Sequence, residues 1–213
     1  SLYAGRGRAL CVAVVVAVSG VAVCAAIAAK PQEVRVSNLA GPQNEPAIAV
    51  DPRDPDTVYA AAHQRRRHVW TLIDGGPEGG IHKTTDGGKT WKKVTAGLPK
   101  EDTGRIGLAI APSEPDTVYA LVEAANKTSG FFRSTNRGET WEKRSDYVSQ
   151  SGQYYNELFA DPKDVGRVYS MDTWLNVTVD GGKTFKRVGE RSKHVDNHAM
   201  WIDPNDPEYL LVG

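Results

Sequence analysis

The fold is decided by the stretch Thr84-Thr85-Asp86-Gly87-Gly88-Lys89-Thr90-Trp91, which recurs as Ser134-Thr135-Asn136-Arg137-Gly138-Glu139-Thr140-Trp141 and as Thr178-Val179-Asp180-Gly181-Gly182-Lys183-Thr184-Phe185. Each copy places a hydroxyl residue, Asp or Asn, Gly, Thr and an aromatic residue at the same spacing. A motif that returns at a period of roughly 40–50 residues indicates a chain built from stacked supersecondary units.

A second motif repeats in phase with the first. Turn clusters with proline stand at residues 51–56, 111–116, 161–166 and 203–208, and apolar residues lie two and four positions before the first proline of each. Alternation at period two predicts a strand before each cluster, and the Asp and Pro residues predict a tight turn to a second strand. Each repeat is therefore expected to hold four antiparallel strands, A to D, with the proline cluster between A and B and the glycine motif between C and D.

These two motifs together resemble the Asp-box (BNR) propellers, which include sialidases, xyloglucanase-type glycosidases and the sortilin-type receptor domain. The resemblance covers about residues 45–213. It implies an all-β fold, a partial β-propeller of four-stranded antiparallel blades at about residues 45–95, 104–145, 155–189 and 197–213, the last one incomplete. Because propellers close with roughly 4–8 blades so that no sheet edge stays open, we expect further blades outside these residues and poor stability of the isolated chain.

The box residues are expected to be structural. The Asp or Asn accepts backbone hydrogen bonds across the turn, the glycine permits a positive φ, and the aromatic ring packs between strands. A calcium loop is the weaker alternative because the motif offers few oxygen ligands. The residues given this structural role are Asp86, Trp91, Asn136, Trp141, Asp180 and Phe185.

The N-terminal residues are of a different kind. Arg6 and Arg8 precede an uncharged apolar run at residues 9–29, and Ala26-Ile27-Ala28 offers a signal-peptidase site. The run predicts an apolar helix, either a cleaved signal peptide or a membrane anchor, with a linker at residues 30–44. Both alternatives predict a secreted, periplasmic or cell-surface protein.

The charge balance excludes one class of partner. The chain has 26 basic and 26 acidic residues and a formal net charge of zero. Without a positive excess there is little to attract phosphates, so nucleic-acid binding is not expected. Membrane contact is expected only through residues 9–29, if they stay attached.

The lengths of the connections indicate which face is functional. The aromatic residue of each box lies 21, 21 and 19 residues before the first proline of the following cluster. In contrast, Pro52, Pro112 and Pro162 lie 34, 24 and 18 residues before the box Asp or Asn that follows each of them. The variation therefore falls between strands B and C. In a four-stranded meander the B–C and D–A connections share one face, and variable loops on a fixed framework usually carry binding and catalysis.

Four segments are expected to meet on that face: residues 63–78, 154–157, 171–174 and 193–198. Their arginines suit carboxylate or phosphate groups, and their aromatic residues suit sugar rings. Solvated loops or packing between blades are the ordinary alternatives. The predicted binding residues are Arg65, Arg66, Arg67, His68, Trp70, Tyr154, Tyr155, Trp174 and Asn197.

The sharpest local pattern is His194-Val195-Asp196-Asn197-His198. If it is extended, both imidazoles and the Asp196 carboxylate share one side, where His194, Asp196 and His198 could bind a divalent metal or perform acid–base chemistry. A polar plug between blades is the alternative. A further metal ligand would have to come from His68, Glu157 or Asp172, and no other cofactor is expected.

Three function classes follow. The favoured prediction is an exported scaffold that binds a protein, peptide or polysaccharide on its variable loops. The alternative is a glycoside hydrolase, which needs two carboxylates about 5–10 Å apart; Glu157, Asp172, Asp196 and Asp74 are the candidates. The missing Arg-Ile-Pro segment before the first box speaks against a sialidase. A metal-dependent hydrolase is the third class.

Overall fold

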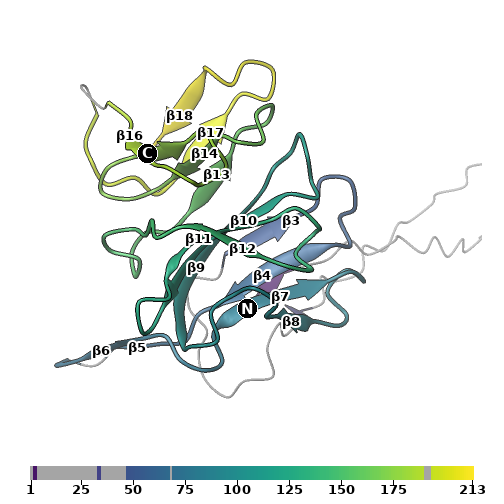
Figure 1. The fold of residues 1–213 in the computed structure, drawn as a ribbon, viewed down its shortest axis with the longest axis vertical. Coiled ribbons are helices and arrows are strands. Elements are labelled where there is room, and N and C mark those ends of the chain that lie inside the picture. The colour runs from purple at the N-terminus through teal and green to yellow at the C-terminus, as the bar shows by residue number, and fades with distance from the viewer. Residues whose placement is uncertain (1, 4–32, 35–46, 68, 190–192) are drawn as a thin grey trace, which may run out of the picture.

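The computed structural model describes residues 2–3, 33–34, 47–67, 69–189 and 193–213 (Figure 1). Every regular element in these ranges is a β-strand, as the all-β prediction requires. None of the described residues forms a helix with the length and apolarity of a membrane span. The predicted apolar helix at residues 9–29 and His68 lie outside the described residues, as does the linker apart from residues 33–34.

Three four-stranded antiparallel sheets follow one another along the chain, and a two-stranded sheet follows them (Figure 1). In each four-stranded sheet the spatial order is that of the chain. The strands are β3 (Ile48–Val50), β4 (Val58–Ala62), β7 (Gly80–Thr84) and β8 (Lys92–Val94); β9 (Thr103–Ile110), β10 (Val118–Ala124), β11 (Gly130–Ser134) and β12 (Glu142–Ser145); β13 (Leu158–Ala160), β14 (Val168–Ser170), β15 (Asn176–Thr178) and β16 (Lys186–Arg187); then β17 (Met200–Ile202) and β18 (Leu210–Val212).

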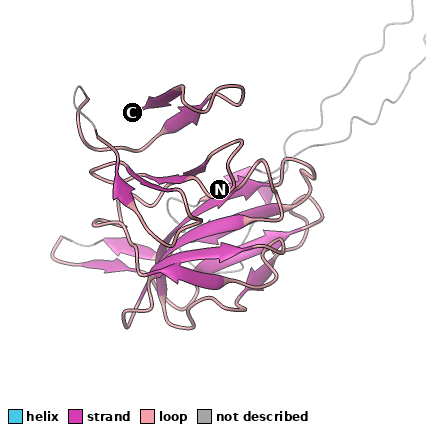
Figure 2. Ribbon diagram, turned by 45° about the horizontal axis from the view of Figure 1, so that its top comes forward, coloured by secondary structure: helices cyan, strands magenta, loops and turns pink. Residues whose placement is uncertain are grey.

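Two further hairpins complete the strands. β1 (Leu2–Tyr3) pairs with β2 (Glu33–Val34), and β5 (Arg65–Arg67) pairs with β6 (Leu72–Asp74). The β5–β6 hairpin projects from the body (Figures 1 and 2). It lies inside the long B–C insertion, which the sequence predicted only as an irregular loop.

The proline clusters form the same A–B turn four times. In each turn the backbone N–H at the first position donates to the carbonyl six residues later, at 3.0 Å: Asp51 to Thr57, Ala111 to Thr117, Asp161 to Arg167, and Asp203 to Tyr209. In three of the turns the aspartate at that first position also accepts a backbone N–H two residues on, at 2.8 to 2.9 Å. The local sequence therefore supplies the hydrogen bonds that close each turn.

The Asp-box closes each C–D turn in an equally repetitive way. The Asp86 carboxylate accepts hydrogen bonds from the Thr84 hydroxyl and from both the backbone N–H and the hydroxyl of Thr90. These bonds to the charged form hold the pKa of Asp86 well below its usual range, with the Thr90 hydroxyl as the largest cause. Asp180 accepts the same three bonds. Asn136 accepts the first two but donates its amide N–H to the Thr140 hydroxyl at 2.9 Å, so the side chain at this box position has structural partners in every copy.

The hydrophobic core lies between consecutive sheets. One cluster joins Tyr59 and Ile81 of the first sheet to Leu108 and Phe132 of the second, and similar clusters join the second sheet to the third and the third to the last pair. Each sheet thus buries its faces against its neighbours in the chain, as propeller blades do.

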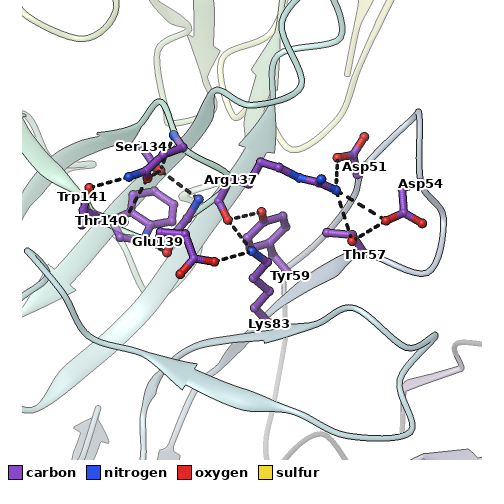
Figure 3. A network of polar contacts seen from close by, with 12 residues as sticks. Asp51, Asp54, Thr57, Tyr59, Lys83, Ser134, Arg137, Glu139, Thr140 and Trp141 are labelled. Atoms are coloured by element: carbon purple, nitrogen blue, oxygen red, sulfur yellow. Dashed lines mark hydrogen bonds and ion pairs between the residues drawn. The ribbon is translucent and has the colours of Figure 1, made fainter.

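Polar contacts tie the turns of neighbouring sheets together (Figure 3). Arg137 of the second box reaches Asp51 at 3.2 Å and Asp54 at 3.4 Å in the first A–B turn. The Tyr59 hydroxyl donates to the Arg137 carbonyl at 2.6 Å, and Lys83 pairs with Glu139 at 3.1 Å. We call the end of the sheets that carries the A–B and C–D turns the turn face. The opposite end, which carries the B–C and D–A connections, is the loop face.

Candidate functional site

The loop face brings together segments from several sheets. Tyr155 contacts Asp196, Asn197 contacts Asp172, and the Arg65 guanidinium lies 5.9 Å from the centre of the Tyr154 ring. All four predicted segments therefore lie on this face and contact one another in pairs.

The centre of one group, the Asp196 cluster, is formed by Tyr155, Asp196 and His198. The Tyr155 hydroxyl donates to the Asp196 carboxylate, and the His198 Nε2 lies 3.2 Å from the same carboxylate oxygen. The rings of Tyr155 and His198 stack with centroids 4.9 Å apart. The Tyr155 hydroxyl, followed by His198, holds the pKa of Asp196 below its usual range.

Asp196 also has an unusual backbone. Its φ is +88°, a region that non-glycine residues rarely adopt, and its N–H donates to the Thr173 carbonyl at 2.9 Å. The side chain is half exposed. A strained residue that presents an ionised carboxylate to solvent is a reasonable candidate for chemistry.

Asp172 has a different role. It is 4% exposed, and its two carboxylate oxygens accept the backbone N–H groups of Gln150 at 2.9 Å and Thr173 at 2.7 Å. Asn197 is fully buried and donates to the carbonyls of Asp172 and Thr173. These two residues hold the loops that carry Tyr155 and Asp196, so their contacts are those of a structural pair.

A second group, the hairpin base, lies where the β5–β6 hairpin meets the second sheet. It consists of His63, Asp74, Arg105 and Glu123. The His63 imidazole pairs with the Asp74 carboxylate, and the Glu123 carboxylate accepts the Arg105 N–H at 3.3 Å. The hairpin is anchored here because Gly76 bridges to Thr103 of β9.

Glu157 is linked to the hairpin base. Its carboxylate pairs with the Arg105 guanidinium, which also donates to the Gln153 carbonyl at 3.4 Å. The neighbouring Asn156 is 2% exposed, has a φ of +103°, and donates to the Arg105 carbonyl at 3.1 Å. Residues 154–157 thus lie between the hairpin base and the Asp196 cluster.

The predicted aromatic residues differ in their availability. Trp70 is 91% exposed at the hairpin tip, and Tyr154 is 47% exposed. Tyr155 is buried beneath His198, and the Arg187 guanidinium covers the ring of Trp174 at 3.1 Å from its centre. Among these four, only Trp70 and Tyr154 present a broad open surface.

The metal prediction finds no support in the arrangement of side chains. Among the described residues no three His, Cys, Asp or Glu side chains gather as a metal site would require. Asp196 and His198 are in contact, but His194 does not complete a set with them.

The sequence singled out neither Arg105 nor Glu123 of the hairpin base, and it included His63 only as the first residue of the segment 63–78. His63 is 1% exposed, and Glu123 is the next-to-last residue of β10, directly after five buried residues with apolar or aromatic side chains. The one available signal was a charged residue at the end of this apolar run in strand B.

Comparison with known proteins identifies a repeat family and several similar proteins. The model of the BNR/Asp-box repeat matches residues 82–93. The xyloglucanase Xgh74A of Acetivibrio thermocellus is 32% identical over 196 residues, which cover 78% of this chain and 22% of that protein. A xyloglucanase of a Paenibacillus species is 31% identical over 198 residues, covering 78% of this chain and 18% of the relative. The chain therefore spans about a fifth of the length of these curated relatives.

A solved structure supports the fold. The GH74 enzyme of Niastella koreensis superposes with a TM-score of 0.52 at 19% identity, over 75% of this chain and 24% of the other. At this identity the likeness establishes the fold alone, which is that of part of a propeller.

Proposed function

This chain is an Asp-box repeat protein, and on that basis we propose that it forms part of a glycoside hydrolase that acts on xyloglucan or a related polysaccharide. The observation that carries the proposal is the 32% identity to a xyloglucanase over 78% of the chain. The matched length is too great to involve the box turns alone, so it also includes loop-face segments. The polysaccharide is proposed to lie across the loop face.

Asp196 is the proposed reactive carboxylate of this chain. Glycoside hydrolysis needs one ionised carboxylate as nucleophile or general base and one protonated carboxyl as general acid. The lowered pKa of Asp196 suits the ionised role, and its half-exposed side chain can reach a substrate. Tyr155 and His198 orient the carboxylate through their hydrogen bonds to it.

The two other predicted carboxylates support the site in this proposal. Asp172 uses both oxygens on backbone N–H groups, which favours a positioning role. Glu157 is held by Arg105, and that pair stabilises the loop between the Asp196 cluster and the hairpin base.

Sugar rings are proposed to stack on Tyr154 and Trp70. Both rings are broadly exposed, and an aromatic face offers an apolar surface of the size of a pyranose ring. Because xyloglucan is a polymer outside the cell, the proposal agrees with export through residues 9–29, which stays a prediction from the sequence.

The test is an assay of xyloglucan hydrolysis by the full-length protein, in which the release of reducing ends is measured. We expect Asp196→Asn to lower kcat about 100-fold or more, since losing an acid–base group removes roughly 10²–10⁴ in rate. Asp203→Asn, in the A–B turn of the last sheet, serves as the matched control and should retain activity. Tight xyloglucan binding without any hydrolysis by the wild type would instead favour the scaffold that the sequence first suggested.

A further inference from the structure

The β5–β6 hairpin carries a run of arginines to which the proposed function assigns no role. β5 consists of three arginines, residues 65–67, and the sequence has no acidic residue between them and Ile73. The acidic residue that follows, Asp74, pairs with the buried His63 at the hairpin base. The hairpin therefore carries a local positive charge, although the whole chain has a net charge of zero.

The hairpin also has open edges. In the part of the chain that the structure describes, β5 and β6 form a two-stranded sheet of their own, which projects from the body (Figures 1 and 2). The bridge from Gly76 to Thr103 fixes its base. An edge strand presents backbone N–H and C=O groups with which another extended chain can pair. The side of β5 that faces away from β6, which we call the β5 edge, can therefore accept a third strand.

The two faces of the hairpin differ in what they meet. The Arg65 guanidinium lies 5.9 Å from the centre of the Tyr154 ring, so the face with Arg65 is turned toward the body. Because side chains alternate along a strand, Arg66 lies on the opposite face. Ile73 is directly across from Arg66 in the register and shares this face. Arg66 is exposed and Ile73 is 53% exposed, so a cation and an aliphatic side chain lie side by side in solvent.

Charge and edge together indicate the chemistry of the partner. A strand added at the β5 edge would place a residue opposite Arg66, and a carboxylate there would form an attractive cross-strand pair. A guanidinium can bind a carboxylate through two parallel hydrogen bonds. A second copy of this chain fits poorly, because symmetric pairing of two β5 edges brings arginines opposite arginines. The aliphatic Ile73 and the backbone edge suit a polypeptide better than a sugar.

We propose that the β5 edge binds an extended acidic segment of a partner protein as an additional strand. A carboxylate of that segment lies opposite Arg66, on the face that carries Ile73, and the two backbones pair along β5. Addition of a peptide strand to an exposed sheet edge is a known mode of recognition. This interaction goes beyond the proposed function, since it uses the face of the hairpin turned away from Tyr154.

The test is calorimetric titration of the full-length protein with an eight-residue peptide of alternating Glu and Val. In a strand the Glu side chains of this peptide all lie on one face. We expect binding at low salt that weakens as the NaCl concentration rises, because exposed charges are screened. A Lys–Val peptide of the same pattern should not bind, since its cations would face the arginines. A Glu–Pro peptide should not bind either, because proline has no N–H to donate to β5.

Substitutions on the protein test the same contact. Arg66→Glu should weaken binding of the Glu–Val peptide about tenfold or more, because a repulsive pair replaces an attractive one. Arg66→Lys keeps the charge and should stay within about threefold of the wild type. Lys89→Glu makes the same change of charge at an exposed position on the turn face, and should bind as the wild type does. Thermal melts report whether each variant folds. If Arg66→Glu does not fold, the comparison of the three peptides on the wild type decides alone.

Four results would overturn the proposal. The first is no binding of the Glu–Val peptide by the wild type, and the second is unchanged affinity in a folded Arg66→Glu. The third is equally tight binding of the Glu–Pro peptide, which would show attraction by charge without a paired strand. The fourth is binding of polygalacturonate oligosaccharides, lost in Arg66→Glu, in place of the Glu–Val peptide. That result would assign the arginines to an acidic polysaccharide. The xyloglucan assay is a separate measurement, so failure of one proposal leaves the other standing.

Discussion

At the scale of single residues, Arg137 shows how one position can serve two purposes. It occupies the box position that Gly87 and Gly181 hold in the other copies, and its φ of +57° is close to their +69° and +68°. A left-handed conformation disfavours a non-glycine residue by about 1–2 kcal/mol. The side chain offsets this strain by reaching Asp51, Asp54 and Thr57 in the neighbouring sheet.

Two substitutions separate the strain from the contacts. Arg137→Gly loses both, so its free energy of unfolding should stay within about 1 kcal/mol of the wild type, because a partly exposed ion pair contributes only about 0–1 kcal/mol. Arg137→Ala keeps the strain and loses the contacts, so it should be less stable than Arg137→Gly by about 1 kcal/mol. Urea unfolding of the three proteins measures the order, and equal stability of the two variants would refute the argument.

At the scale of elements, the three boxes make the same turn but place their aromatic rings differently. Trp141 is 6% exposed and belongs to the core between the first two sheets, and its indole N–H donates to Gly138 at 3.2 Å. Trp91 makes the equivalent bond to Gly88 at 3.0 Å but is only half-buried. The ring therefore stabilises the turn in both copies and the core in one.

This difference predicts unequal effects of the same substitution. Trp141→Ala should lower the free energy of unfolding by about 3–5 kcal/mol, as expected when a large core side chain is removed. Trp91→Ala should lower the free energy of unfolding by about half that or less, because the half-buried Trp91 ring has less buried apolar area to lose. Chemical denaturation of both variants is the measurement. A larger loss for Trp91→Ala would contradict the assignment of the core.

At the scale of the whole molecule, the sheets bury their inner faces and leave apolar residues exposed at both outer sheets. Ile48 and Val50 of β3 are 45% and 49% exposed, and Trp201 and Leu211 of the last pair are 49% and 57% exposed. Exposed apolar side chains on short edge sheets favour association with other chains. The faces between consecutive sheets are therefore buried in the described structure, whereas apolar side chains of the first and last sheets stay exposed.

Self-association of this 213-residue chain should follow. We expect sedimentation velocity to detect oligomers or aggregates that increase with protein concentration. The double substitution Trp201→Lys and Leu211→Lys should reduce them, while the double substitution Ser113→Lys and Thr135→Lys, at exposed turn positions of the second sheet, should not. A chain that stays monomeric at high concentration and melts in one cooperative transition would contradict this expectation.

The functional site was only partly predictable from the sequence. The repeat period located the loop face, and Tyr154, Tyr155, Asp172 and Asp196 all lie there. Their roles were not predictable. The Asp172 carboxylate accepts hydrogen bonds from backbone N–H groups, and the Arg187 guanidinium covers the ring of Trp174. Such differences arise from contacts between residues far apart in the sequence, which period and spacing do not encode.

The sequence alone determined the strands and turns of the repeats and the order of the sheets, because each turn is closed by hydrogen bonds between residues at most six positions apart. It did not predict the β5–β6 hairpin. Only the tertiary structure decided which polar residues became structural, such as Asp172, and which stayed exposed to solvent, such as Asp196. The physical reason is that burial and electrostatic environment depend on which segments pack together in space, and those neighbours come from different sheets.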